Sequence, residues 1–262
     1  MNLDLNNKNA FVSGSSQGIG SASAIELSKL GANVTIVGRN KDLLDSTYSK
    51  LDVSKGQNHK ILVIDYSVRG ELKTEIDKFI AQGNKVDILI NNMGGPKAGA
   101  AYKADLEEFE EAFYNHVINN QFLAQTFIPQ MKENGWGRII NIISTSVKSP
   151  IKGLGVSNTI RGAVGNWSKS MAMEMGKYNI TVNNVLPGST ITARHDDIVR
   201  MKSEKTGKSM EEIEYEMKEL IPMKRFASPN EVANAVAFLA SPAADYINGI
   251  NIPVDGGRTE NL

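Results

Sequence analysis

Short runs of β-branched and other apolar residues alternate with longer amphipathic segments along nearly the whole chain. Seven such runs have the length and composition of strands buried on both faces, and they cover residues 9–13, 33–37, 60–65, 86–91, 138–143, 180–185 and 250–254. Apolar residues at three-to-four spacing predict helices over residues 20–30, 71–81, 106–131, 155–176 and 230–240. This alternation predicts an α/β fold of three layers, in which helices cover both faces of a doubly wound parallel sheet. The ligand crevice then opens at the carboxyl ends of the strands.

The 262 residues contain no repeat and no Pro/Ser-rich or low-complexity stretch, so we expect a single domain over residues 1–262. One stretch, Thr190 to Met223, interrupts the alternation with two further predicted helices rich in Lys, Glu and Met. An excursion of this length is either a solvated surface appendage or a mobile lid over the crevice. We favour a substrate lid at about residues 190–223, because its Met and Ile side chains suit a substrate-facing wall.

Composition excludes several classes of function. The 29 basic and 29 acidic residues give zero formal charge, which argues against nucleic-acid or anionic-membrane partners. The chain has no cysteine, and its three histidines, His59, His116 and His195, have no metal-binding spacing, so we expect no metal site. No apolar leader or membrane-length segment is present, so a cytoplasmic protein is expected.

A glycine-rich turn follows the first predicted strand and leads directly into a helix. Its residues are Gly14, Ser15, Ser16, Gln17, Gly18, Ile19 and Gly20. Glycines suit this position because the turn is tight and a pyrophosphate must approach bare backbone, with the positive end of the helix facing the phosphate. The strand, turn and helix together predict a dinucleotide site, and an ordinary tight turn is the alternative.

The end of the second predicted strand bears on the choice of dinucleotide. An NAD-binding protein usually has Asp or Glu there, whereas this chain has Arg39 and Asn40. A guanidinium pairs with a 2′-phosphate that a carboxylate would repel, so NADP(H) is favoured over NAD(H). Asp65 could accept from the adenine amino group, and Asn91 to Gly94 could place backbone against the adenosine half; either could instead be a helix cap.

Taken together, these residues resemble the short-chain dehydrogenase/reductase family, specifically its β-ketoacyl-carrier-protein-reductase-like branch. The resemblance rests on the glycine turn and four later stretches, Asn91–Gly94, Gly137–Ser144, Val182–Gly188 with Thr192, and Arg225–Val232 with Val254–Gly257. It implies a Rossmann-type fold, an NAD(P)(H) cofactor placed in part by Pro187, Gly188 and Thr192, and usually a homotetramer, with a dimer as the alternative. Members of this family move a hydride between nicotinamide and a carbonyl or alcohol carbon.

The family resemblance also implies four catalytic positions, and only one of them carries the expected residue. Ser144 matches the family's serine, which orients the carbonyl. Ser157 stands where the family's tyrosine is expected, and Arg161 stands where its lysine is expected. Spacing along the preceding helix places His116 at the position of the family's asparagine.

These substitutions change the chemistry that the site can perform. A serine hydroxyl is far too weak an acid to replace a phenol of pKa ~10. Arg161 lies on the same helical face as Ser157 and can hold ribose or stabilise an oxyanion, but a guanidinium effectively never releases its proton. His116 could transfer a proton if it faces the crevice, or it could be a structural histidine capped by backbone in a helix interface.

Two functions follow from this sequence. The first is an NADP(H)-dependent oxidoreductase acting on a small-molecule carbonyl or secondary alcohol, in which His116, water or a substrate group carries the proton. The alternative is a catalytically silent NADP(H)-binding sensor or scaffold. We favour the oxidoreductase, because the residues expected at the nicotinamide end, Ser144 and Thr192 among them, are retained.

Overall fold

The computed structural model describes residues 1–261 and contains one seven-stranded parallel sheet. Its strands are β1 (Asn9–Val12), β2 (Asn33–Gly38), β3 (Lys60–Val63), β4 (Ile88–Asn92), β5 (Gly137–Ile142), β6 (Ile180–Pro187) and β7 (Asn251–Val254), in the order β3-β2-β1-β4-β5-β6-β7. The chain first builds outward from β1 to β3 and then returns to add β4 on the other side of β1. This reversal creates the crevice between the ends of β1 and β4 where doubly wound sheets bind ligands.

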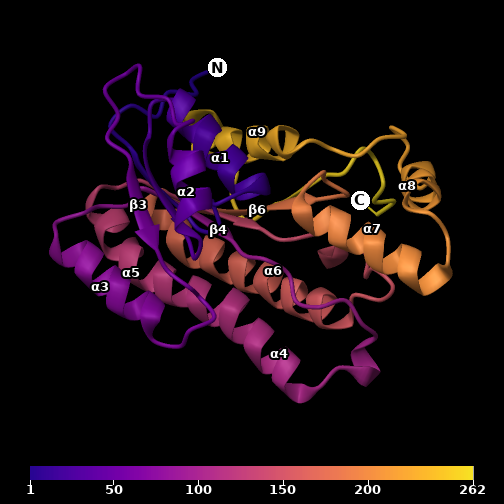
Figure 1. The fold of residues 1–262 in the computed structure, drawn as a ribbon. Helices are drawn as coiled ribbons and strands as arrows, with labels where there is room; N and C mark the ends of the chain where they lie inside the picture. Colours follow the sequence, from indigo (N-terminus) through magenta and orange to yellow (C-terminus); the bar gives the residue numbers. More distant parts are fainter. Residues whose placement is uncertain (262) are drawn as a thin grey trace.

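Helices cover both faces of the sheet, as Figure 1 shows. The helices are α1 (Gly18–Lys29), α2 (Lys41–Tyr48), α3 (Glu71–Ala81), α4 (Leu106–Phe113), α5 (Asn119–Glu133), α6 (Gly155–Met175), α7 (Ala193–Thr206), α8 (Met210–Glu219) and α9 (Pro229–Ala240). The three-layer parallel α/β fold expected from the sequence is confirmed. Among residues 1–261, no helix combines the length and the apolar character needed to cross a bilayer.

Side-chain alternation in β1 explains how the sheet joins two hydrophobic cores. Ala10 and Val12 belong to the core under α1 and α9, whereas Phe11 points to the opposite core under α3, α5 and α6. Burial on both faces accounts for the continuous apolar runs that the sequence shows in place of a hydrophobic-polar alternation. The core that results holds the carboxyl ends of the strands in a fixed array.

The single helix expected over residues 106–131 is interrupted in the structure, so that expectation is wrong in this detail. A π-helical turn over Tyr114–Ile118 separates α4 from α5. Apolar spacing cannot reveal such a turn, because one extra residue shifts the phase only locally. The turn contains His116, whose side chain is buried.

The excursion after β6 contains α7 and α8, close to the two helices expected there. Four of its side chains form a small core with Phe226, which follows the excursion: Val199, Ile213, Met217 and Ile221. The N-terminus of α8 is fixed locally by a reciprocal capping box between Ser209 and Glu212. We call residues 190–223 the lid segment; its movement over the crevice stays a prediction.

Candidate active site

A cavity of about 820 Å³ opens at the carboxyl ends of the strands. The glycine turn after β1, the segments that follow β4, β5 and β6, and the start of α6 and α7 all contribute to its wall. Its position at the reversal of strand order is where the sequence places the crevice, and its size is typical of small-molecule and cofactor sites.

The glycine turn has the close backbone packing that its residues predict. A β-carbon on Gly20 would overlap the carbonyl oxygen of Gly14, and one on Gly14 would lie 2.9 Å from Asn92 Nδ2. Gly18 has a φ of +59°, in the left-handed region that glycine adopts most readily. At the start of α1, Gln17 provides no side-chain cap and the first turn has no acidic residue, so its amide groups suit an anion.

Two side chains hold the turn in place, one of which the sequence analysis assigned to the cofactor. Ser15 is fully buried; its hydroxyl donates to the Val12 carbonyl over 2.8 Å and accepts from the Val37 amide. Asn92 Nδ2 donates to the Gly14 carbonyl over 3.0 Å. Ser15 is therefore a support of the turn, while Ser16, Gly18 and Ile19 line the cavity.

The residues at the ends of β2 and β3 lie just outside the cavity wall. The Arg39 side chain is 77% exposed, and its guanidinium lies 3.9 Å from Asp65 Oδ2. Asn40 Oδ1 accepts from the Leu43 amide and so caps α2. Hydrogen bonds from Ser67, opposed by partial desolvation, keep the pKa of Asp65 below its usual value, so this carboxylate is ionised at neutral pH.

At the end of β4, the two asparagines of the stretch predicted to contact the cofactor point in different directions. The Asn91 side chain points into the sheet, where its Nδ2 donates to Asn141 Oδ1 over 2.8 Å. Asn92 and Gly94 line the cavity instead. Because neighbouring residues in a strand point to opposite sides, only one of Asn91 and Asn92 can face the ligand.

The segments after β5 and at the start of α6 bring the candidate catalytic residues into the same cavity. Ser144, Ser157 and Arg161 all line it. The Ser144 hydroxyl oxygen accepts from the Ser146 amide over 3.1 Å, which leaves the hydroxyl proton free to donate to a ligand. Ser157 and Arg161 are one helical turn apart on α6, as expected from their spacing.

Arg161 is a buried cation that ties two strand ends together. Its guanidinium donates from Nη1 to the Ile142 carbonyl over 3.0 Å and from Nη2 to the Met93 carbonyl over 3.2 Å. Burial, together with the nearby charge of Arg194, lowers the pKa of Arg161 to about 10. Arg161 therefore stays protonated at neutral pH and supplies a fixed positive charge to the cavity.

His116 is absent from the cavity wall, although the sequence analysis considered it for proton transfer. Its side chain is buried in the π-helical turn, and the Gly94 backbone forms a hydrogen bond with it. Burial first, and the positive charge of Arg161 second, lower the pKa of His116 to about 3. This placement favours the structural alternative for His116 over proton transfer.

The loop after β6 closes the cavity on the side of the lid segment. Pro187, Gly188 and Thr192 all line it. A β-carbon on Gly188 would lie 2.7 Å from Asp255 Cβ, so the loop packs closely against the segment after β7. Thr192 caps α7 by accepting from the His195 amide, and its methyl group packs directly against Gly18, where an added β-carbon would lie 3.2 Å from it.

His195 is one of several cavity residues that the sequence analysis did not name as site candidates. His195 is buried against the Phe226 ring, with 4.3 Å between ring centroids, and its Nε2 has no hydrogen-bond partner within the described residues. Burial lowers the pKa of His195, which makes the neutral form dominant at pH 7. Only its position three residues after the helix-capping Thr192 could have suggested a role, and that signal is weak.

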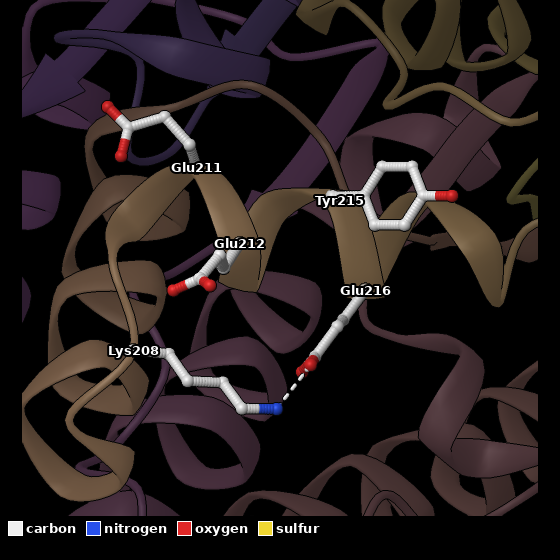
Figure 2. A pocket seen from close by; sticks show the side chains of 5 residues that line it. All are labelled: Lys208, Glu211, Glu212, Tyr215 and Glu216. Atoms are coloured by element: carbon white, nitrogen blue, oxygen red, sulfur yellow. Dashed lines mark hydrogen bonds and ion pairs between the residues drawn. The ribbon is translucent and has the colours of Figure 1, made fainter.

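A second hollow, of about 500 Å³, lies against α8 and carries no comparable arrangement. Figure 2 shows its five side chains, of which Lys208 pairs with Glu216 while Glu211 points away from them. Glu212 is used in the capping box of α8. Over residues 1–261, no cluster of His, Cys, Asp or Glu could hold a metal ion.

Comparison with known proteins assigns this fold and cavity to a family. A family model described as enoyl-(acyl carrier protein) reductase matches residues 14–259. The chain belongs to the short-chain dehydrogenase/reductase family of NAD(P)-binding oxidoreductases.

Individual relatives are similar over their whole length. The NADPH-dependent reductase BacG of Bacillus subtilis is 31% identical over 260 residues, covering 98% of this chain and 100% of that protein. The 7alpha-hydroxysteroid dehydrogenase of Escherichia coli K12 is 30% identical, covering 100% of this chain and 98% of that protein. The crystal structure of L-sorbose reductase from Gluconobacter frateurii, complexed with NADPH and L-sorbose, has a TM-score of 0.92 at 29% identity and full coverage of both chains.

Proposed function

We propose that this protein is an NADP(H)-dependent oxidoreductase that acts on a small-molecule carbonyl or secondary alcohol with a non-standard set of catalytic residues. The observation that carries the proposal is one cavity that gathers the glycine turn, Ser144, Ser157 and Arg161. Relatives named as NADPH-dependent reductases support both the reaction class and the cofactor.

The residues of the cavity fit a dinucleotide. The glycine turn and the uncapped start of α1 would hold the pyrophosphate, and Arg39 would pair with a 2′-phosphate beside the ribose. When bound, NADPH supplies the hydride. Thr192 and Gly188, which line the cavity in the loop after β6, would position the nicotinamide end.

The side chains of this protein would orient the substrate and stabilise charge. The hydroxyl proton of Ser144 is free to donate to the substrate oxygen, because the Ser144 hydroxyl oxygen already accepts from the Ser146 amide. The buried charge of Arg161 stabilises negative charge that develops in the cavity. Neither Ser157 nor Arg161 is a proton donor at neutral pH, so water or a group of the substrate delivers the proton.

Titration of the purified protein with NADPH and NADH tests the cofactor assignment. We expect saturable NADPH binding and weaker NADH binding. Arg39→Ala should weaken NADPH binding about tenfold and leave NADH binding unchanged, because only NADPH carries the 2′-phosphate.

Absorbance of the reduced nicotinamide, followed against β-ketoesters, diketones, quinones and sugars, then tests turnover. NADPH binding without any turnover would support the sensor alternative, and no binding of either dinucleotide would refute the cofactor assignment.

A double substitution tests whether the cavity has kept the family geometry. Ser157→Tyr with Arg161→Lys introduces the tyrosine and lysine that the family resemblance implies at these positions, one helical turn apart on α6. General acid catalysis contributes ~10²–10⁴ in rate, so a gain of at least 100-fold with a simple ketone is expected. Ser157→Phe with Arg161→Lys is the control for ring volume. Equal rates for the two double variants would contradict an otherwise intact site.

A further inference from the structure

The cavity wall has a one-sided distribution of charge. Six cationic side chains line it, Lys152, Arg161, Arg194, Lys202, Lys205 and Arg258, and no aspartate or glutamate does. The chain as a whole has equal numbers of basic and acidic residues, so this imbalance is local to the cavity. A cleft lined by one sign of charge concentrates ligands of the opposite sign.

These six cations also lack ion-pair partners within residues 1–261. Twelve ion pairs form in that part of the chain, and none of them includes a cavity cation. Arg161 and Arg194 donate to backbone carbonyls instead, the latter to Pro96 over 2.7 Å. Within residues 1–261, their positive charges are therefore not neutralised by a carboxylate in an ion pair.

Two of the cations lie together on the lid side of the cavity. Lys202 comes from α7 and Arg258 from the segment after β7, which Figure 1 shows beside α7. Burial and the nearby Arg258 charge lower the pKa of Lys202, while the carboxylate of Glu216 raises it. Glu216 forms its ion pair with Lys208 (Figure 2), and within residues 1–261 no ion pair joins it to Lys202 or Arg258.

The phosphates of the dinucleotide do not account for this pair. The groups suited to them are the glycine turn, the start of α1 and Arg39, which lie at the ends of β1 and β2. Arg258 instead donates to Ser189 Oγ over 3.2 Å, in the loop after β6 that closes the lid side of the cavity. Ile198, Met201 and Met217 line the cavity with Lys202, so this wall combines apolar surface with positive charge.

Resting on the proposed reductase function, we propose that the substrate is an anionic carbonyl compound whose carboxylate or phosphate group is bound by Lys202 and Arg258. The guanidinium fork and the ammonium group both suit these anions. The apolar residues of α7 and α8 contact the carbon skeleton, and the carbonyl lies at Ser144.

Matched pairs of probes test this proposal. Levulinate is compared with methyl levulinate for a carboxylate, and dihydroxyacetone phosphate with dihydroxyacetone for a phosphate. Binding of each probe to the protein saturated with NADP⁺ is measured by calorimetry, and turnover with NADPH is measured separately. We expect at least one anion to bind ten times or more tighter than its neutral partner, and the preferred pair identifies the anion.

Charge-removing variants locate the anion site. Lys202→Gln and Arg258→Gln should each weaken binding of the preferred anion about 10- to 100-fold and change binding of the neutral partner less than threefold. Arg200→Gln is the matched control, because Arg200 lies on the same helix outside the cavity wall and pairs with Asp197. NADPH affinity is measured for every variant.

Each outcome decides the proposal. Equal binding of acid and neutral probes, or equal effects of Arg200→Gln and Lys202→Gln, would overturn it. If Lys202→Gln and Arg258→Gln lose NADPH affinity to the same extent as anion affinity, the two cations belong to the cofactor site and the proposal is overturned. Selective anion binding without turnover would support the anion site while refuting the reductase, so the two failures are distinguishable.

Discussion

At the scale of single residues, His116 shows how burial changes the chemistry of a side chain. Its pKa is lowered from 6.5 to about 3, mainly by desolvation. Between these values the unfolded chain binds a proton that the folded protein does not, so the free energy of unfolding falls as the pH falls below 6.5. Above pH 6.5, His116 is neutral in both the folded and the unfolded protein, so it no longer makes the free energy of unfolding depend on pH.

We therefore expect His116→Asn to remove part of the acid sensitivity of the protein. Between pH 7 and pH 5, the wild type should lose about 2 kcal/mol of unfolding free energy more than the variant, at ~1.4 kcal/mol per pH unit. Urea unfolding at several pH values measures this difference. Parallel pH profiles for the two proteins would contradict a buried neutral His116. His59→Asn is the control, because His59 is also buried and tests whether replacement of any buried histidine has the same effect.

Gly18 provides a second residue-scale prediction. Gly18→Ala places a methyl group about 3.2 Å from Thr192 Cγ2 and strains a backbone with φ of +59°. We expect about 1 kcal/mol of lost stability and at least a tenfold loss of NADPH affinity. Gly83→Ala is the control, with φ of +78° and no neighbour within 4 Å, and should show the stability loss alone. Unchanged NADPH affinity in Gly18→Ala would argue against the dinucleotide site.

At the scale of elements, the lid segment has a core that is separate from the two sheet cores. Ile213 is 3% exposed within that small core, and truncation of such a residue typically costs 2–5 kcal/mol. A small independent core implies that α8 can open without the rest of the molecule.

We expect Ile213→Ala to accelerate amide hydrogen exchange in α8 by at least tenfold while exchange in α5 is unchanged. Glu211→Ala, on the exposed side of α8, should leave both rates nearly unchanged. Mass spectrometry of exchanged peptides measures the rates. A uniform acceleration across α8 and the sheet would show instead that the lid segment and the sheet unfold as one unit.

The elements also show what sequence reasoning can and cannot reach. Strands and long helices were predictable because burial on one or two faces leaves a periodic apolar pattern, as in β1 and α3. The π-helical turn at His116 and the orientation of Asn91 were not, because both depend on packing between segments distant in sequence. The inward position of Ser144, Ser157 and Arg161 followed from the family resemblance, whereas the partners of Arg161 required the fold.

At the scale of the whole molecule, the surface of α4 bears on assembly. Leu106 and Phe113 are 76% and 43% exposed on this helix, and the family resemblance implies a homotetramer. Exposed apolar side chains of this size, two turns apart and so on one face of the helix, are typical of contact surfaces. We propose that α4 lies in the subunit interface.

Light scattering after size exclusion should then give about four times the 28.5 kDa of one chain. Phe113→Glu should dissociate the assembly, because a charge would be buried without a partner. Ile80→Glu on α3, where the native side chain is 40% exposed, is the control and should leave the mass unchanged. A monomeric wild type would refute the interface.

The cavity wall extends from Gly14 to Arg258, which has a consequence for synthesis of the chain. The glycine turn leaves the ribosome well before β4, with which β1 must still pair, and the lid side waits for the segment after β7. Parallel sheets of this kind fold late because their contacts join distant parts of the chain. A nascent chain therefore displays the glycine turn long before the cavity wall is complete, so the whole cavity forms only after Arg258 has been translated.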